Sequence, residues 1–115
     1  MHGCASLVGS VTQSFASDLG AAILNSDDPH MVRDGAPAYL ILIDSLLAGN
    51  PQNRALLEQS AELHSAYAGA FVAEPERAKR LHLKAKTQIL QAACAGLNNG
   101  CGLDQRPYAE FAMWV

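Results

Sequence analysis

The fold is decided by residues 25–53, which read NSDDPHMVRDGAPAYLILIDSLLAGNPQN. Asp27 or Asp28 can cap the free N–H groups of a helix, and Pro29 suits the first turn because its missing N–H has no partner there. Gly49 indicates the end of the helix, since glycine accepts the left-handed conformation that commonly closes one and the proline two positions later cannot continue it. The stretch therefore predicts a helix from about residue 29 to residue 49.

The apolar residues within this helix follow the three- and four-residue steps of one helix face. They are Val32, Ala36, Tyr39, Leu40, Ile43 and Leu47, with Ile41, Leu42 and Leu46 widening the stripe past half of the circumference. Because so wide a stripe leaves little surface for water, we expect this helix to be the central one of the fold.

The same reasoning predicts three more long helices, over residues 7–24, 54–71 and 75–95. Their inward faces are predicted to include Phe15 in the first, Leu56, Leu57, Leu63, Tyr67 and Phe71 in the second, and Ala78, Leu81, Ala85, Ile89 and Ala92 in the third. Residues 96–102 hold three glycines and two asparagines, which predicts a loop, and Pro107 opens a short last helix that ends at Val115. We expect an all-α fold of about four long helices and a short C-terminal helix.

Length and composition place the chain in one globular domain, residues 1–115. Half of the residues are hydrophobic and the net charge is −3, so the chain is neither disordered nor a polyanion binder by overall charge. No apolar run approaches the roughly 18 to 20 residues that span a bilayer. Prolines at 29, 51, 75 and 107 give a period of about 45 residues for a helix pair, longer than the roughly 34 of a tetratricopeptide unit. This predicts divergent, tetratricopeptide-like helical hairpins.

Several of these segments together resemble a known family. They are DDP, VRDGAPAYL and LIDSLL within residues 27–47, YAGAF at 67–71 and ERAKRL at 76–81. In this order and spacing they resemble the TatT family, whose members are tetratricopeptide-like lipoproteins associated with tripartite ATP-independent periplasmic (TRAP) transporters. The likeness runs from Cys4 to about Phe111, and each piece alone would pass for an ordinary amphipathic helix.

The resemblance implies a periplasmic, non-catalytic accessory protein without a cofactor. Its members are expected to form homo-oligomers, to enclose a channel or cavity, and to associate with the solute-binding protein of the transporter, for small organic acids or hydrophobic carboxylates. They continue past the equivalent of Val115, so we expect this chain to match the N-terminal part of a longer domain, and no ligand-binding residue is assigned. The alternatives are a helical interaction scaffold with no transport role and a helical module that binds nucleic acid.

The cysteine nearest the N-terminus, Cys4, follows Gly3 and precedes Ala5 and Ser6. This is what remains around the modified cysteine of a bacterial lipoprotein after its signal peptide is removed, and the resemblance implies a lipid anchor here. The alternative is an ordinary thiol near a frayed end. No hydrophobic leader precedes Cys4 in this numbering, so we expect the sequence to be a mature or trimmed form.

The other two cysteines, Cys94 and Cys101, are seven positions apart on either side of the glycine- and asparagine-rich loop. In the periplasm a disulfide between them would close a short loop, which is worth about 2 kcal/mol in the chain-entropy model. Two reduced thiols are the alternative. Metal binding is disfavoured because neither a Cys-x-x-Cys pair nor a nearby histidine supplies a tetrahedral set.

Other polar residues have structural explanations that compete with functional ones. His64 and His82 lie on consecutive predicted helices and are expected to be structural or solvated. The carboxylates Asp27, Asp28 and Asp34 could form an acidic cluster, but their place at a helix start favours capping. Because no phosphate loop, nucleophile elbow or metalloprotease motif occurs, we expect no enzyme activity and no metal site.

Two further features concern partners. Five of the eight basic residues fall within positions 77–86, and a solvated helix face is favoured over a surface for nucleic acid or anionic lipid. In the last helix, Tyr108, Phe111, Met113 and Trp114 would cover most of the circumference. One terminal helix cannot turn all of them inward, so we expect a dimer or larger oligomer to cover them.

Overall fold

The computed structural model describes residues 14–107 of the chain. Residues 14–24 are helical, and three long helices follow, α2 (Pro29–Gly49), α3 (Arg54–Phe71) and α4 (Pro75–Gly96), with a short 3₁₀ turn at Leu103–Gln105. No strand occurs in residues 14–107, so the predicted all-α fold is confirmed. The start of the first predicted helix and most of the predicted C-terminal helix lie outside the described residues.

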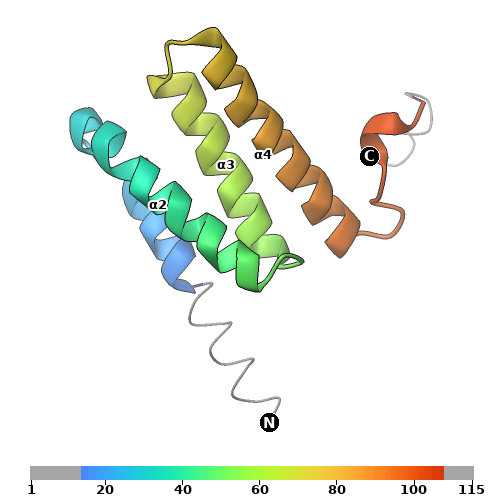
Figure 1. The fold of residues 1–115 in the computed structure, drawn as a ribbon. Coiled ribbons are helices and arrows are strands. Elements are labelled where there is room, and N and C mark those ends of the chain that lie inside the picture. Colours follow the sequence, from blue (N-terminus) through green and yellow to red (C-terminus); the bar gives the residue numbers. More distant parts are fainter. Residues whose placement is uncertain (1–13, 108–115) are drawn as a thin grey trace.

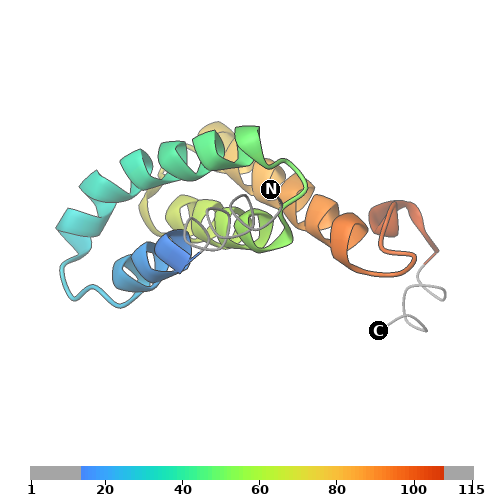
Figure 2. The same cartoon turned by 90° about the horizontal axis from the view of Figure 1, so that it is seen from below.

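The helices form two consecutive hairpins in two layers (Figures 1 and 2). Seen from below, α2 and α4 lie in one layer, with the helix of residues 14–24 and α3 in the other. Helix α3 contacts both α2 and α4. Helix α3 therefore lies in the middle of the three long helices (Figure 1). The prediction of a central α2, which rested on the width of its apolar stripe, is wrong.

The helix ends are set by local capping. Asp28 Oδ1 accepts hydrogen bonds from the backbone N–H groups of His30 and Met31, both at 3.1 Å. Asn53 Oδ1 accepts one from the N–H of Leu56, also at 3.1 Å. These side chains satisfy donors that the first helical turn leaves free. Asp28 is thus a cap, as predicted.

The core lies around α3, where this helix meets α2, α4 and the helix of residues 14–24. Its buried members are Ala16, Tyr39, Leu40, Ile43, Leu47, Leu56, Leu57, Leu63 and Ala92. The Tyr39 hydroxyl donates a buried hydrogen bond of 2.5 Å to the carbonyl of Ala16. This bond links α2 to the helix of residues 14–24 within an otherwise apolar interface. Among residues 14–107, no helix is long and apolar enough to cross a membrane.

Four large side chains predicted to lie inward are exposed. They are Phe15, Ile41, Leu42 and Ile89, and Ile41 is 70% exposed. The prediction for Ile89 is wrong because α4 turns the stripe Ala85, Gln88 and Ala92 toward α3. Small side chains let two helices approach closely, and this alanine stripe leaves Ile89 at the flank, 46% exposed.

Candidate functional site

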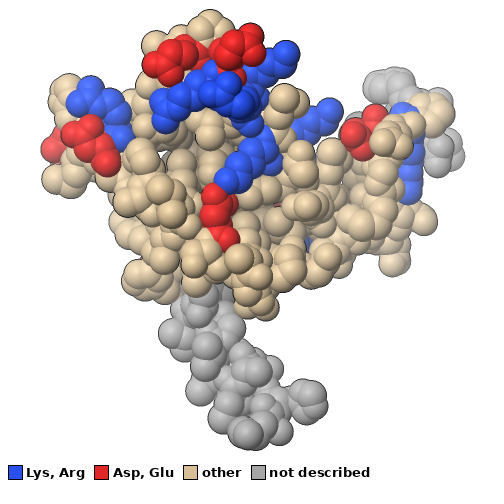
Figure 3. Space-filling view, in the orientation of Figure 1, with Lys and Arg blue, Asp and Glu red and all other residues tan. Residues whose placement is uncertain are grey.

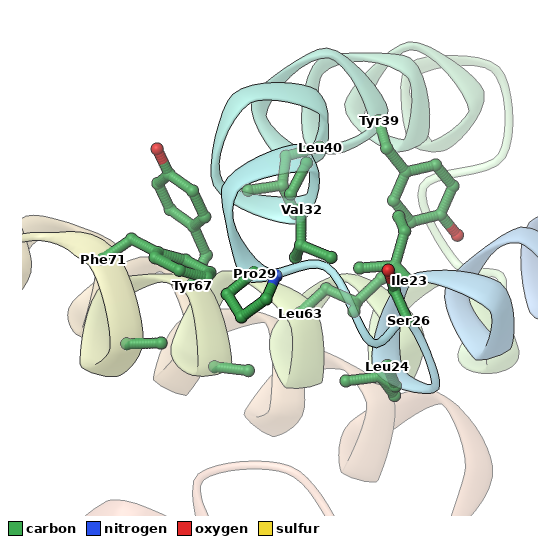
Figure 4. Close-up of a pocket in the computed structure, with 13 residues that line it drawn as sticks. Ile23, Leu24, Ser26, Pro29, Val32, Tyr39, Leu40, Leu63, Tyr67 and Phe71 are labelled. Carbon is green, nitrogen blue, oxygen red and sulfur yellow. The ribbon is translucent and has the colours of Figure 1, made fainter.

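An apolar groove lies between the start of α2, the end of α3 and the turn that precedes α2 (Figure 4). We call it the α2–α3 groove; its volume is about 230 Å³. It is lined by Ile23, Leu24, Ser26, Pro29, Val32, Ala36, Tyr39, Leu40, Leu63, Ala66, Tyr67, Ala70 and Phe71. Typical pockets for drug-sized ligands measure about 300 to 1,000 Å³, so this groove suits a small apolar group.

The walls of the groove come from the capping and spacing of three helices. The Asp28 cap and Pro29 start α2 above the last turns of α3, and Val32 and Leu40 project from α2 between the two helices (Figure 4). On α3, Tyr67 and Phe71 are one turn apart, with ring centroids separated by 5.6 Å. The alanines at positions 66 and 70 add little volume next to these rings, which leaves the space open.

The groove offers few polar atoms and no charge. Lys, Arg, Asp and Glu are all missing from its described lining. The Ser26 hydroxyl accepts a hydrogen bond of 3.2 Å from the backbone N–H of Asp28. The Tyr39 hydroxyl is bonded to Ala16, and burial raises the pKa of Tyr39. Since an ionised group is costly to bury without a partner, an apolar group fits inside and a carboxylate would stay at the mouth.

A second apolar groove lies on the other side of the contact between α2 and the helix of residues 14–24. It has a volume of about 470 Å³ and shares five residues with the first, including Val32 and Tyr39. Its remaining lining is Leu19, Ala22, Met31, Gly35, Ala38 and Leu42. Met31 and Leu42 are exposed, so this side of α2 presents an apolar surface to the surroundings.

A buried polar cluster lies where α3 meets α4. His64 Nδ1 is 2.8 Å from the carbonyl oxygen of Ser60 and 3.1 Å from its hydroxyl. Because a carbonyl only accepts, this geometry favours the tautomer in which Nδ1–H donates. Burial lowers the pKa of His64, with a smaller contribution in the same direction from Lys84. Ser60 is 0% exposed, so its hydroxyl cannot reach a substrate, and the pair stabilises the helix interface.

Gln88 of α4 is also buried, and its Oε1 has no hydrogen-bond partner in residues 14–107. Lys84, one helical turn earlier, pairs with Asp44 of α2 at 2.5 Å and so joins α2 to α4. The prediction of a solvated basic face is therefore wrong for Lys84. It holds for Lys79, Arg80 and Lys86, which are exposed.

The other residues singled out from the sequence lie apart from both grooves. Cys4 and the aromatic residues after position 107 are outside the described residues. Cys94 and Cys101 are joined by a disulfide, with their Cα atoms 4.1 Å apart; oxidation in the native compartment stays a prediction. The His82 ring accepts from or donates to the Ser65 hydroxyl at 3.3 Å on the surface. Within residues 14–107, no three His, Cys, Asp or Glu residues are grouped to hold a metal.

Sequence reasoning did not find the grooves. The signal for the first was present in α3, where two aromatic residues four positions apart alternate with alanines at 66, 68 and 70. Such a pattern shows an aromatic stripe beside unfilled volume. It does not show which helix end covers the stripe, because Ile23 and Val32 come from other elements.

Comparison with known proteins places the chain in a family. Residues 25–114 match the family described as TRAP transporter T-component. A comparison with curated proteins gives no match, and a comparison with solved structures gives none either. The matched range includes α2, α3 and α4 in full, and most of the lining of the α2–α3 groove. The chain therefore belongs to the TRAP transporter T-component family.

Proposed function

We propose that this chain is a periplasmic, lipid-anchored accessory protein of a TRAP transporter that holds a small hydrophobic carboxylate in the α2–α3 groove. Association with a TRAP transporter is what membership of the family implies. The observation that carries the ligand class is the groove itself, whose lining is mostly apolar and contains no charged residue. An acid with a short hydrocarbon tail would bury that tail in the groove and leave its carboxylate in water, which avoids burying an unpaired charge.

The ligand is tested by isothermal titration of the full chain with octanoate and, in parallel, with succinate. We expect octanoate to bind and succinate not to bind, since succinate has no apolar end to bury. Ala70→Leu places a larger side chain in the groove and should weaken octanoate binding at least tenfold. The matched control is Ala73→Leu, which is exposed and outside the groove. Equal binding of the two acids, or equal loss in both variants, would contradict the proposed ligand class.

The proposed protein partner is the solute-binding protein of the same transporter. The support is again family membership, and the test is a pull-down with the solute-binding protein whose gene lies beside the TRAP permease genes. Co-purification of the two proteins at physiological salt is the expected result. A helical scaffold with no transport role is the second candidate, and it would be favoured if the two proteins failed to associate.

The proposed anchor is a lipid on Cys4. It is supported by the small residues around that cysteine and by the family likeness. Expressed behind a bacterial lipoprotein leader, the protein should fractionate with membranes and incorporate labelled palmitate, and Cys4→Ser should abolish both. Unchanged labelling in Cys4→Ser would show that Cys4 is not the modified residue.

We also propose that the chain forms a homo-oligomer through the outer side of α2. Ile41, Met31 and Leu42 are large apolar residues exposed along this helix, and exposed apolar patches of several hundred square ångströms usually mark interfaces. Light scattering coupled to size exclusion should report a multiple of 12.2 kDa, and Ile41→Asp should lower it toward one copy. A monomeric wild type at micromolar concentration would refute this proposal.

A further inference from the structure

An exposed leucine on the outer side of α4 is surrounded by basic residues. We call Lys79, Arg80, Leu83 and Lys86 the Leu83 patch; all four are exposed, and Leu83 is 51% exposed. Positions three and four residues away are the neighbours of a side chain on a helix surface. Lys79 and Arg80 precede Leu83 by four and three positions, and Lys86 follows it by three. Three of its four helical neighbours are therefore cations, and the fourth is Thr87.

None of these three cations forms an ion pair within residues 14–107, although Glu76 lies three and four positions before Lys79 and Arg80. In residues 14–107, no carboxylate lies within 4.0 Å of a nitrogen of Lys79, Arg80 or Lys86, whereas Arg77 and Lys84 of the same helix have such partners. Their ammonium and guanidinium groups are therefore exposed and not held by a carboxylate of the described chain, so they can pair with carboxylates of a partner.

The patch is the positive end of a negatively charged molecule. Residues 74–86 contain five basic and two acidic residues, a net charge of +3, while the rest of the chain contains three basic and nine acidic residues, a net charge of −6. Figure 3 shows Lys and Arg side chains gathered over the first half of α4, next to the α3–α4 turn. Charge separation of this kind orients a molecule toward an oppositely charged partner before contact.

We propose that the Leu83 patch docks an acidic surface of a soluble partner protein. Leu83 supplies the apolar contact that is removed from water, and the surrounding cations pair with carboxylates of the partner. Interfaces commonly have this arrangement, an apolar centre within a polar rim. The α2–α3 groove contains no residue of α4, so this surface is separate from the proposed ligand site.

A membrane surface would also attract these cations, but the apolar part of the patch does not fit one. Helices that lie in a membrane interface present a continuous apolar face. Leu83 is the one large apolar residue of the patch, since its helical neighbours are Lys79, Arg80, Lys86 and Thr87. Ile89, which is also exposed, lies six positions further on, and the alanine stripe of α4 packs against α3. The start of α4 also lies at the end of the helical array opposite the start of the helix of residues 14–24 (Figure 1).

The test measures binding of the full chain to three immobilised probes by biolayer interferometry. The probes are the solute-binding protein of the transporter, whose choice rests on the proposed function, poly-L-glutamate, and vesicles of 70% phosphatidylcholine and 30% phosphatidylglycerol. The patch variant is Lys79→Ala with Lys86→Ala. Its control, Arg33→Ala with Arg54→Ala, removes the same charge from exposed residues elsewhere. A further variant, Leu83→Ser, keeps the charge and removes the apolar contact.

We expect the patch variant to weaken binding to the solute-binding protein at least tenfold, with a shallower dependence on salt, and the control to change it less than twofold. Leu83→Ser should weaken it about fivefold. Binding to poly-L-glutamate but not to the solute-binding protein would support the patch and refute the partner chosen in the proposed function. The patch proposal is wrong if the two double variants lose the same affinity for the solute-binding protein, if neither that protein nor poly-L-glutamate binds, or if vesicles alone bind through the patch.

Discussion

The hydrogen bond between Tyr39 and Ala16 gives the sharpest test of how the first hairpin is held together. The Tyr39 hydroxyl donates to the Ala16 carbonyl at 2.5 Å, and the tyrosine is buried. Tyr39→Phe keeps the ring and removes only this donor. A buried hydrogen bond contributes about 1 kcal/mol net, so the free energy of unfolding should fall by that amount. With a urea m-value of about 1–3 kcal/mol/M, the unfolding midpoint should fall by about 0.3–1 M.

Tyr67→Phe is the matched control. Tyr67 is half-buried at the end of α3, and its hydroxyl makes no hydrogen bond within residues 14–107. Removing that hydroxyl should change the free energy of unfolding by less than about 0.3 kcal/mol, because a change at a site without a specific interaction is usually small. Urea titrations followed by circular dichroism at 222 nm give both values.

A second readout comes from repeating the urea titrations at alkaline pH. Burial raises the pKa of Tyr39 above its ordinary value of 10.0. Between pH 10.0 and that raised pKa the folded state keeps a proton that the unfolded state has lost, so the free energy of unfolding falls as pH rises. Tyr39→Phe should remove this part of the alkaline loss, and Tyr67→Phe should retain it. Equal effects of the two variants at neutral and alkaline pH would refute the assignment of the hydrogen bond.

Three further predictions concern a core position, the disulfide and the buried histidine. Ile43→Asp should cost several kcal/mol because it places an unpaired charge where the side chain is 0% exposed, and Ser45→Asp on the exposed side should cost less than about 0.5 kcal/mol in the same denaturation assay. Periplasmic protein should show Cys94 and Cys101 protected from alkylation until a reductant is added, by intact mass; two freely alkylated thiols would contradict the disulfide. Because burial lowers the pKa of His64 below 6.5, the free energy of unfolding should fall as pH drops below that value, and His64→Gln should remove this loss.

The long helices could be predicted from the sequence because their ends are local events. The cap at Asp28, the cap at Asn53 and the prolines at 29 and 75 each act within one turn of the residue concerned. The predicted bounds of α2 therefore agree with the structure at both ends. No capping residue or proline predicted the 3₁₀ turn at Leu103–Gln105, and no helical turn was predicted there.

The faces of the helices were harder to predict because burial depends on the neighbour and not on the residue alone. Ile89 is more apolar than Gln88, yet Gln88 is buried at 7% exposure. The close approach of α3 and α4 at Ala85 and Ala92 fixes the rotation of α4, and Gln88 lies between these alanines on the same stripe. The periodicity argument correctly placed Ala85 and Ala92 on the inward face, but it could not show that the small residues bring the helices together on the side of Gln88 and not of Ile89. The same limit hid the α2–α3 groove, which is formed by unfilled space between three helices.

The positions of the groove and the Leu83 patch have a consequence for how the protein would act. The groove is lined by α2, α3 and the residues before them, and the patch belongs to α4 alone. A protein docked on the outer side of α4 would therefore leave the groove lining uncovered by its direct contacts. If the two surfaces act independently, Ala70→Leu should weaken octanoate binding without changing affinity for the solute-binding protein, and Lys79→Ala with Lys86→Ala should do the reverse. Loss of both activities in either variant would show instead that the two surfaces are coupled, because a variant that disturbs only its own site cannot alter the other.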